Sequence, residues 1–210
     1  YQCPACGGDT GDSPLTFCEN RMDDNEIYVI ELLKRKFNIT LCKIPETEDS
    51  RSPDFKGYRG KELILHAELK TIVPSSAPTG WFVVTHKDGS KSAIPDVNAL
   101  SRLAYKIHKS YGQLILFPQP RVLILLNDDP NVDLGHLEGV YTGYELHTDG
   151  KNEIISPCYD YGFSKRIDNE KSVVDLYLWI DRHNGNAIYL KTTNQVGEDL
   201  ADNAFDISHH

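Results

Sequence analysis

Apolar residues along the chain fall into alternating helical and strand patterns. Helical spacing runs from Asp23 to Phe37, where Asp23 or Asp24 can cap the first turn and basic residues occupy the last turn. A second helical pattern covers residues 95–114. Its apolar face consists of Leu100, Leu103, Ala104, Ile107 and Tyr111. We therefore predict two amphipathic helices, each of which packs one face on a core.

The remaining periodic segments are typical of strands. Most alternate between apolar and polar residues, and turn residues separate them into hairpins. The run RVLILLN is apolar throughout, which is typical of a strand buried on both faces. The last hairpin is expected to turn at Asn184-Gly185. The predicted strands and hairpins lie at residues 38–44, 53–72, 81–95, 121–127, 142–155 and 173–193.

The order of these elements predicts a layered α/β domain rather than a sandwich or a helix bundle. Residues 1–22 differ from the rest because they are rich in Cys, Gly, Asp and Pro, and we interpret them as a small lead-in. Residues 23–195 form the predicted main domain. Residues 196–210 are mostly polar and are expected to be a loose tail.

Composition narrows the class of protein without deciding it. The 210 residues are 40% hydrophobic and 25% charged, as in ordinary globular domains. A net charge of −9 argues against a polyanion binder that is basic all over, although it leaves room for a local basic groove. No apolar run reaches the roughly 20 residues of a membrane helix, so no membrane partner is expected. The five cysteines and the absence of a recognisable secretion signal favour a reducing, cytoplasmic location.

A carboxylate and an amine lie at the end of the strand predicted within residues 62–72. Glu68 and Lys70 are two residues apart and therefore share a face of the strand. A hairpin turn centred near residues 59–60 would bring Asp54 opposite a position between 64 and 68. The two carboxylates would then lie close together with the lysine beside them.

Such a cluster suits a divalent cation. Neighbouring carboxylates repel each other unless a cation lies between them, and Mg²⁺ prefers oxygen ligands while it keeps several waters. A bound Mg²⁺ can polarise a phosphodiester and lower the pKa of its water, and Lys70 can offset charge at the phosphorus. The ordinary alternative is a solvated Glu–Lys pair and an Asp that serves the turn. His66, on the same face, is more simply explained as a buried, hydrogen-bonded histidine.

Pro53-Asp54 and Glu68-Leu69-Lys70, within the element order of residues 24–127, resemble the PD-(D/E)XK nuclease superfamily. The resemblance covers about half of the chain. It implies a restriction-endonuclease-like fold, which is a three-layer α/β core with a mixed central sheet flanked by helices. The C-terminal β-hairpins would then be additions to that core.

The resemblance also assigns roles to residues. It implies that Asp54, Glu68 and the backbone carbonyl of Leu69 bind a Mg²⁺ or Mn²⁺ ion, and that Lys70 is catalytic. Many members add a glutamate from the first helix. Of Glu26 and Glu31 we favour Glu26, because it starts the helix before the apolar stripe.

The implied function is a Mg²⁺-dependent endonuclease that hydrolyses DNA. A compact chain of this size is most similar to a type II restriction enzyme, which implies double-stranded DNA as substrate and a homodimer. Two alternatives remain. One is a catalytically inactive nucleic-acid-binding module on the same fold, and the other is a zinc-stabilised interaction protein.

The cysteines at the start of the chain suggest a separate metal site. Cys3 and Cys6 have zinc-knuckle spacing, and Cys18 could be a third ligand to Zn²⁺. A fourth ligand would come from elsewhere, with Cys42, Cys158 or a histidine as candidates. The alternative is a pair of reduced thiols without a metal.

Basic residues around the predicted site are candidate phosphate contacts. For any one of them, a solvated surface charge is the simpler explanation. They are Lys56, Arg59, Lys61, Lys87, Lys91, Arg102, Lys106 and Lys109.

Overall fold

The structure is a computed structural model of the chain. It describes residues 22–45, 52–74, 81–85, 88–95, 97–148, 154–159, 167–185 and 187–205. The predicted lead-in with Cys3, Cys6 and Cys18 therefore lies outside the described residues.

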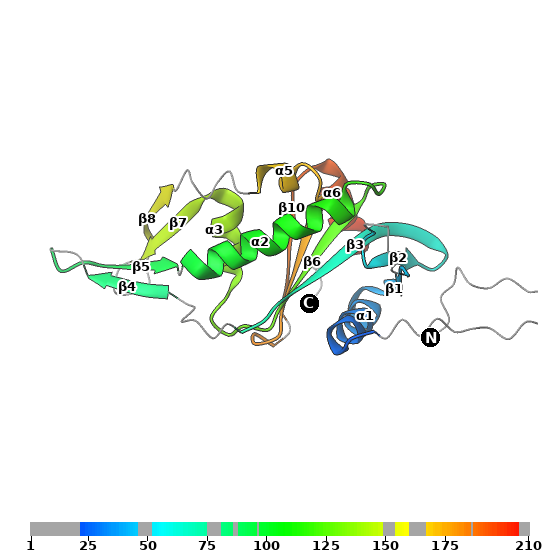
Figure 1. Cartoon of the computed structure of the whole chain (residues 1–210), viewed down its shortest axis with the longest axis horizontal. Coiled ribbons are helices and arrows are strands. Elements are labelled where there is room, and N and C mark those ends of the chain that lie inside the picture. The colour runs from blue at the N-terminus through cyan, green and yellow to red at the C-terminus, as the bar shows by residue number, and fades with distance from the viewer. Residues whose placement is uncertain are drawn as a thin grey trace, which may run out of the picture.

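A six-stranded mixed open sheet forms the centre of the molecule (Figure 1). The strand order is β1-β2-β3-β6-β9-β10. β3, β6 and β9 are parallel to one another, and the other neighbouring pairs are antiparallel. The strands span Thr40–Lys43 (β1), Phe55–Arg59 (β2), Glu62–Ile72 (β3), Arg121–Asn127 (β6), Leu176–Asp181 (β9) and Ala187–Thr192 (β10).

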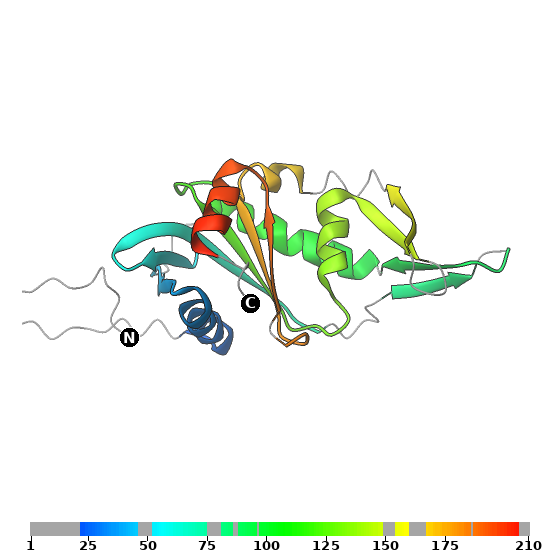
Figure 2. The ribbon, with the colours of Figure 1, turned by 180° about the vertical axis from the view of Figure 1, so that it is seen from behind.

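Helices cover both faces of this sheet and give the molecule three layers (Figure 2). α1 and α6 pack on one face around Leu65, Ala67 and Ile124. α2 and α3 pack on the other face around Leu125 and Trp179. The helices span Asp24–Phe37 (α1), Val97–Leu114 (α2), Leu134–Thr142 (α3), Asp168–Lys171 (α5) and Gln195–Ala204 (α6). None of the helices within the described ranges is long and apolar enough to cross a bilayer.

Two small hairpins lie apart from the main sheet. β4 (Trp81–Thr85) pairs with β5 (Lys91–Pro95), and β7 (Tyr144–Thr148) pairs with β8 (Ile154–Tyr159). Figure 1 shows both pairs beyond the N-terminal end of α2, far from β1 and β2. They therefore stand at the opposite end of the molecule from the first hairpin of the sheet.

The predicted α/β class and the mixed sheet flanked by helices are confirmed. β6 lies between two parallel neighbours and is buried along nearly its whole length, as its apolar run predicted. The last two strands differ from the prediction in their place, because β9 and β10 pair with each other as predicted but belong to the central sheet and are not an addition to it. All of β9 is buried, as expected for a strand that lies between β6 and β10.

The expectation of a loose tail after residue 195 is wrong for the part of it that the structure describes. Asn194 caps α6 by accepting a hydrogen bond from the Gly197 N–H at 3.0 Å. Leu200, Ala204 and Phe205 are buried in the same core as α1. The segment looks polar because its apolar positions are few, yet their spacing places them on one helical face.

Candidate active site

The pairing of β2 with β3 brings Asp54 to Glu68. Phe55 is opposite Ala67 in this antiparallel pair, so Asp54, the residue before β2, lies beside Glu68. The Asp54 N–H donates to Oε2 of Glu68 at 3.2 Å, and the Leu69 N–H donates to Oδ2 of Asp54 at 2.8 Å. The sequence-based register predicted this proximity, and the structure has it.

Lys70 completes the cluster from the same strand. Its ammonium group pairs with Oε1 of Glu68 and donates to Oε1 of Gln113 in α2 at 3.1 Å. Gln113 was missed by the sequence analysis, because its contact with Lys70 depends on how α2 packs over β3. The lysine is thus held between a carboxylate and an amide.

The polar face of β3 is more deeply buried than its alternating pattern suggested. The Glu68 side chain is 0% exposed and that of Lys70 is 19% exposed. His66 is also buried, and its Nδ1 donates to the Pro118 carbonyl at 3.1 Å. Burial lowers the pKa of His66. A neutral, hydrogen-bonded histidine therefore explains this residue without a role at a phosphate.

Glu26 faces β1 from the first turn of α1. It closes a capping box with Asp23, and its carboxylate binds the Lys43 ammonium at 2.6 and 2.8 Å. Its charge also contributes to raising the pKa of Asp54. Glu31, by contrast, is exposed. Glu26 is therefore the first-helix carboxylate whose charge reaches the Asp54–Glu68 pair.

The electrostatics of the pair resemble those of a functional site. Burial raises the pKa of Asp54, and the Leu69 N–H and the Lys70 charge act against that rise. Burial, together with the neighbouring charge of Asp54, raises the pKa of Glu68 to about 8, despite the opposing effect of Lys70. Carboxyl groups that repel each other in a buried place are found more often at functional sites than elsewhere.

Two carboxylates suit a Mg²⁺ ion better than an all-protein metal cage. Within the described ranges, no three His, Cys, Asp or Glu side chains are grouped so that they could hold one ion. Mg²⁺ is commonly bound by one or two carboxylates, with waters and substrate phosphates as the other ligands. Asp54 and Glu68 fit that arrangement, whereas the role of the Leu69 carbonyl remains a prediction.

The two arginines among the candidate phosphate contacts bind groups within the protein. The Arg59 guanidinium donates to the carbonyls of Asn203 and Ala204 at the end of α6. Arg102 donates to the Val73 carbonyl at 3.0 Å and to Asp129 at 2.9 Å. Both arginines therefore join elements of the fold.

The zinc prediction falls mostly on residues outside the described ranges. Cys3, Cys6 and Cys18 all lie there. Of the proposed fourth ligands, Cys42 lies on β1 and is partly exposed, and Cys158 lies on β8. The zinc site stays a prediction.

No known protein family, curated protein or solved structure matches the chain. The interpretation of the site therefore depends on its own geometry.

Proposed function

We propose that the chain is a Mg²⁺- or Mn²⁺-dependent nuclease that hydrolyses phosphodiester bonds of DNA. The observation that carries the proposal is the buried contact between Asp54 and Glu68 from adjacent strands, with the Lys70 ammonium beside it. Two like charges in a buried place destabilise the fold unless a proton or a cation neutralises one of them. A divalent cation is the ligand that would remove their repulsion.

The order of elements around the pair supports the same proposal. α1, β1, β2, β3, α2 and β6 follow one another in the order expected for the PD-(D/E)XK superfamily, apart from the inserted β4–β5 hairpin. Asp54 and Glu68 would hold the ion, which would polarise the phosphodiester and activate a bound water. Lys70, kept in place by Gln113, would bind a phosphate oxygen or orient the attacking water.

The finer parts of the proposal follow from the resemblance. Double-stranded DNA would be the substrate, and a homodimer similar to a type II restriction enzyme would cut both strands. A cytoplasmic location would agree with an odd number of cysteines.

The direct test is cleavage of supercoiled plasmid DNA with Mg²⁺ or Mn²⁺ and with EDTA. We expect nicked and linear products from the wild type only when a divalent cation is present. Asp54→Asn, Glu68→Gln and Lys70→Ala should each lower the rate by about 100-fold or more, as losses of transition-state stabilisation by charged groups do.

Glu26→Gln and Glu31→Gln form a matched pair of variants on α1. We expect a lower rate only for Glu26→Gln, because Glu31 is exposed and its charge is not among those that shift the pKa of Asp54 or Glu68. Binding of DNA without cleavage would favour the inactive module on the same fold. If a folded wild-type protein neither binds nor cleaves DNA, the zinc-stabilised interaction protein is the remaining alternative.

A further inference from the structure

One side of α2 carries a basic stripe in a protein that is acidic overall. The chain has 31 acidic and 22 basic residues, yet residues 97–114 contain no Asp or Glu. Arg102, Lys106, Lys109 and Gln113 follow one another at helical spacing and share one side of the helix. The stripe therefore concentrates positive charge on one side of the helix.

The two lysines of this stripe have no anionic partner in the described part of the protein. No ion pair there involves Lys106 or Lys109. Arg102 differs, since its guanidinium holds the Val73 carbonyl and Asp129. The arginine thus fixes α2 against the end of β3, and the lysines remain available to a ligand.

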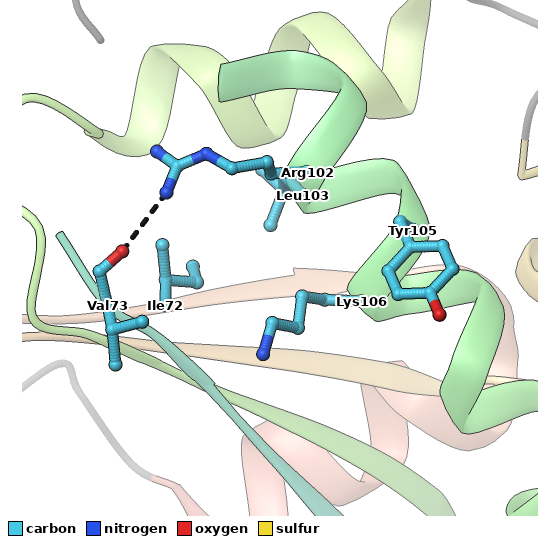
Figure 3. Close-up of a pocket in the computed structure, with 6 residues that line it drawn as sticks. All are labelled: Ile72, Val73, Arg102, Leu103, Tyr105 and Lys106. Atoms are coloured by element: carbon cyan, nitrogen blue, oxygen red, sulfur yellow. Dashed lines mark hydrogen bonds between the residues drawn. The ribbon is translucent and has the colours of Figure 1, made fainter. Parts of the chain in front are cut away.

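An aromatic ring and a hollow accompany the lysines. Tyr105 is 57% exposed, and Nζ of Lys109 lies 5.3 Å from the centre of its ring. Lys106 lines a hollow of about 140 Å³ between α2 and the end of β3, together with Ile72 and Val73. Figure 3 shows Lys106 and Tyr105 projecting from the same stretch of α2. Exposed aromatics beside lysines are typical of surfaces that bind nucleic-acid strands.

The stripe leads to the candidate active site. Gln113, which binds Lys70 at 3.1 Å, follows Lys106 by seven residues. Seven residues of helix rise about 10 Å, which equals the axial rise of about three nucleotides in one strand of duplex DNA. A strand whose phosphates lie along α2 would therefore reach the carboxylates within a few nucleotides.

We infer that Lys106 and Lys109 form a track for the phosphate backbone of the nucleic-acid strand that enters the Asp54–Glu68 site, with Tyr105 as a stacking surface. This inference rests on the proposed function, because it names where that site binds its substrate. Charge complementarity selects the occupant, since an apolar or cationic partner would leave both ammonium groups without a counter-charge.

Binding of fluorescein-labelled DNA, as duplex and as single strand, tests the inference. Anisotropy is measured with Mg²⁺ over a series of salt concentrations, in the Lys70→Ala background so that the probe stays intact. Lys106→Ala/Lys109→Ala should weaken binding about 10-fold or more and lower the slope of log K against log salt by about one for each lysine. Tyr105→Ala should weaken binding of the single strand more than binding of the duplex.

The control variant Arg35→Ala/Lys36→Ala removes the same charge from exposed positions of α1, on the other side of the sheet. It should leave the salt slope nearly unchanged, whereas Lys106→Arg/Lys109→Arg should restore binding. Equal losses in the α1 and α2 variants would overturn the inference, because only net charge would then matter. A folded protein that binds neither probe would overturn it as well.

The two proposals fail in different ways. If the α2 double variant keeps full affinity while plasmid cleavage still depends on Asp54, the track is wrong and the nuclease stands. If the wild type cuts nothing but binds DNA through Lys106 and Lys109, the nuclease is wrong and the two lysines belong to a nucleic-acid-binding module without catalysis.

Discussion

A buried glutamate next to an aspartate destabilises a fold unless a proton or a cation neutralises one of them. In the absence of a metal, a proton on Glu68 removes one of the two charges, because burial and the charge of Asp54 raise the pKa of Glu68 to about 8. The ordinary pKa of a glutamate in an unfolded chain is near 4.5. The folded protein therefore holds a proton that the unfolded chain releases between these two values, so stability falls as the pH rises through this window.

Glu68→Gln should remove this pH dependence, since glutamine keeps the shape and carries no charge. In EDTA, we expect the free energy of unfolding of the wild type to fall relative to that of the variant between pH 5 and 8. The difference should be on the order of 2–4 kcal/mol, because one pKa unit corresponds to about 1.4 kcal/mol. Urea unfolding at several pH values measures it, and parallel curves for the two proteins would contradict the raised pKa.

Gly197 is required by a close backbone contact in the first turn of α6. A Cβ at this position would lie 1.9 Å from the Asp175 carbonyl oxygen, and the helix cap Asn194 binds both Gly197 and Asp175. We expect Gly197→Ala to lower the free energy of unfolding by at least about 2 kcal/mol, as overpacking of a close contact does. Glu198→Ala, at the exposed next position, should change it by less than about 0.5 kcal/mol. Thermal or urea unfolding of both variants decides the matter, and equal stabilities would refute the contact.

At the scale of the element, α6 joins distant parts of the fold. Its N-cap Asn194 also donates to Asp175 at 2.8 Å, and that buried carboxylate accepts from Gln119 and from the Arg121 N–H at 2.7 Å each. Arg59 binds the carbonyls at the other end of the helix. The helix thus connects the hairpin that carries Asp54 to the middle of the sheet.

Phe205→Ala tests whether α6 belongs to the core. Phe205 is buried and packs edge-to-face on Phe37, with the ring centres 5.1 Å apart. Its truncation should cost about 3–5 kcal/mol, as large-to-small changes in a core do. Leu116→Ala is the control, since Leu116 is 72% exposed and should lose less than about 0.5 kcal/mol. Circular dichroism during urea unfolding measures both, and a small loss for Phe205→Ala would restore the loose-tail interpretation.

The parts of the fold that the sequence predicted are those with strong local signals. α1, β6 and the β2–β3 register follow from periodicity, an apolar run and a glycine turn, and the register brought Asp54 to Glu68. α6 was missed because its apolar positions are sparse among acidic residues. The burial of Glu68 and the contact of Lys70 with Gln113 could not be predicted, because both depend on the packing of α2 over β3.

At the scale of the whole molecule, a cation at the Asp54–Glu68 pair would act on global stability. A ligand that binds only the folded state stabilises it by about 2.7 kcal/mol at a concentration 100 times its Kd. We expect Mn²⁺ or Mg²⁺ to raise Tm, and to raise it more at pH 8 than at pH 6, because the ion competes with the proton on Glu68. Differential scanning fluorimetry at matched ionic strength measures the shift.

Two variants separate metal binding from catalysis in that experiment. Asp54→Asn should abolish the shift, since it removes a ligand. Lys70→Ala should keep or enlarge it, because the ammonium group that competes for Glu68 is gone. A shift that survives in Asp54→Asn would assign the ion to another place.

The edge-to-face contact of Phe37 with Phe205 has a consequence for biosynthesis. One outer layer of the protein is assembled from segments near opposite ends of the described chain, α1 and α6. A ribosome makes α1 early, but its apolar side has no complete packing surface until residue 205 has emerged. We therefore expect nascent chains arrested before residue 195 to be cut by protease within α1. Chains in which residue 205 has left the ribosome should resist the protease.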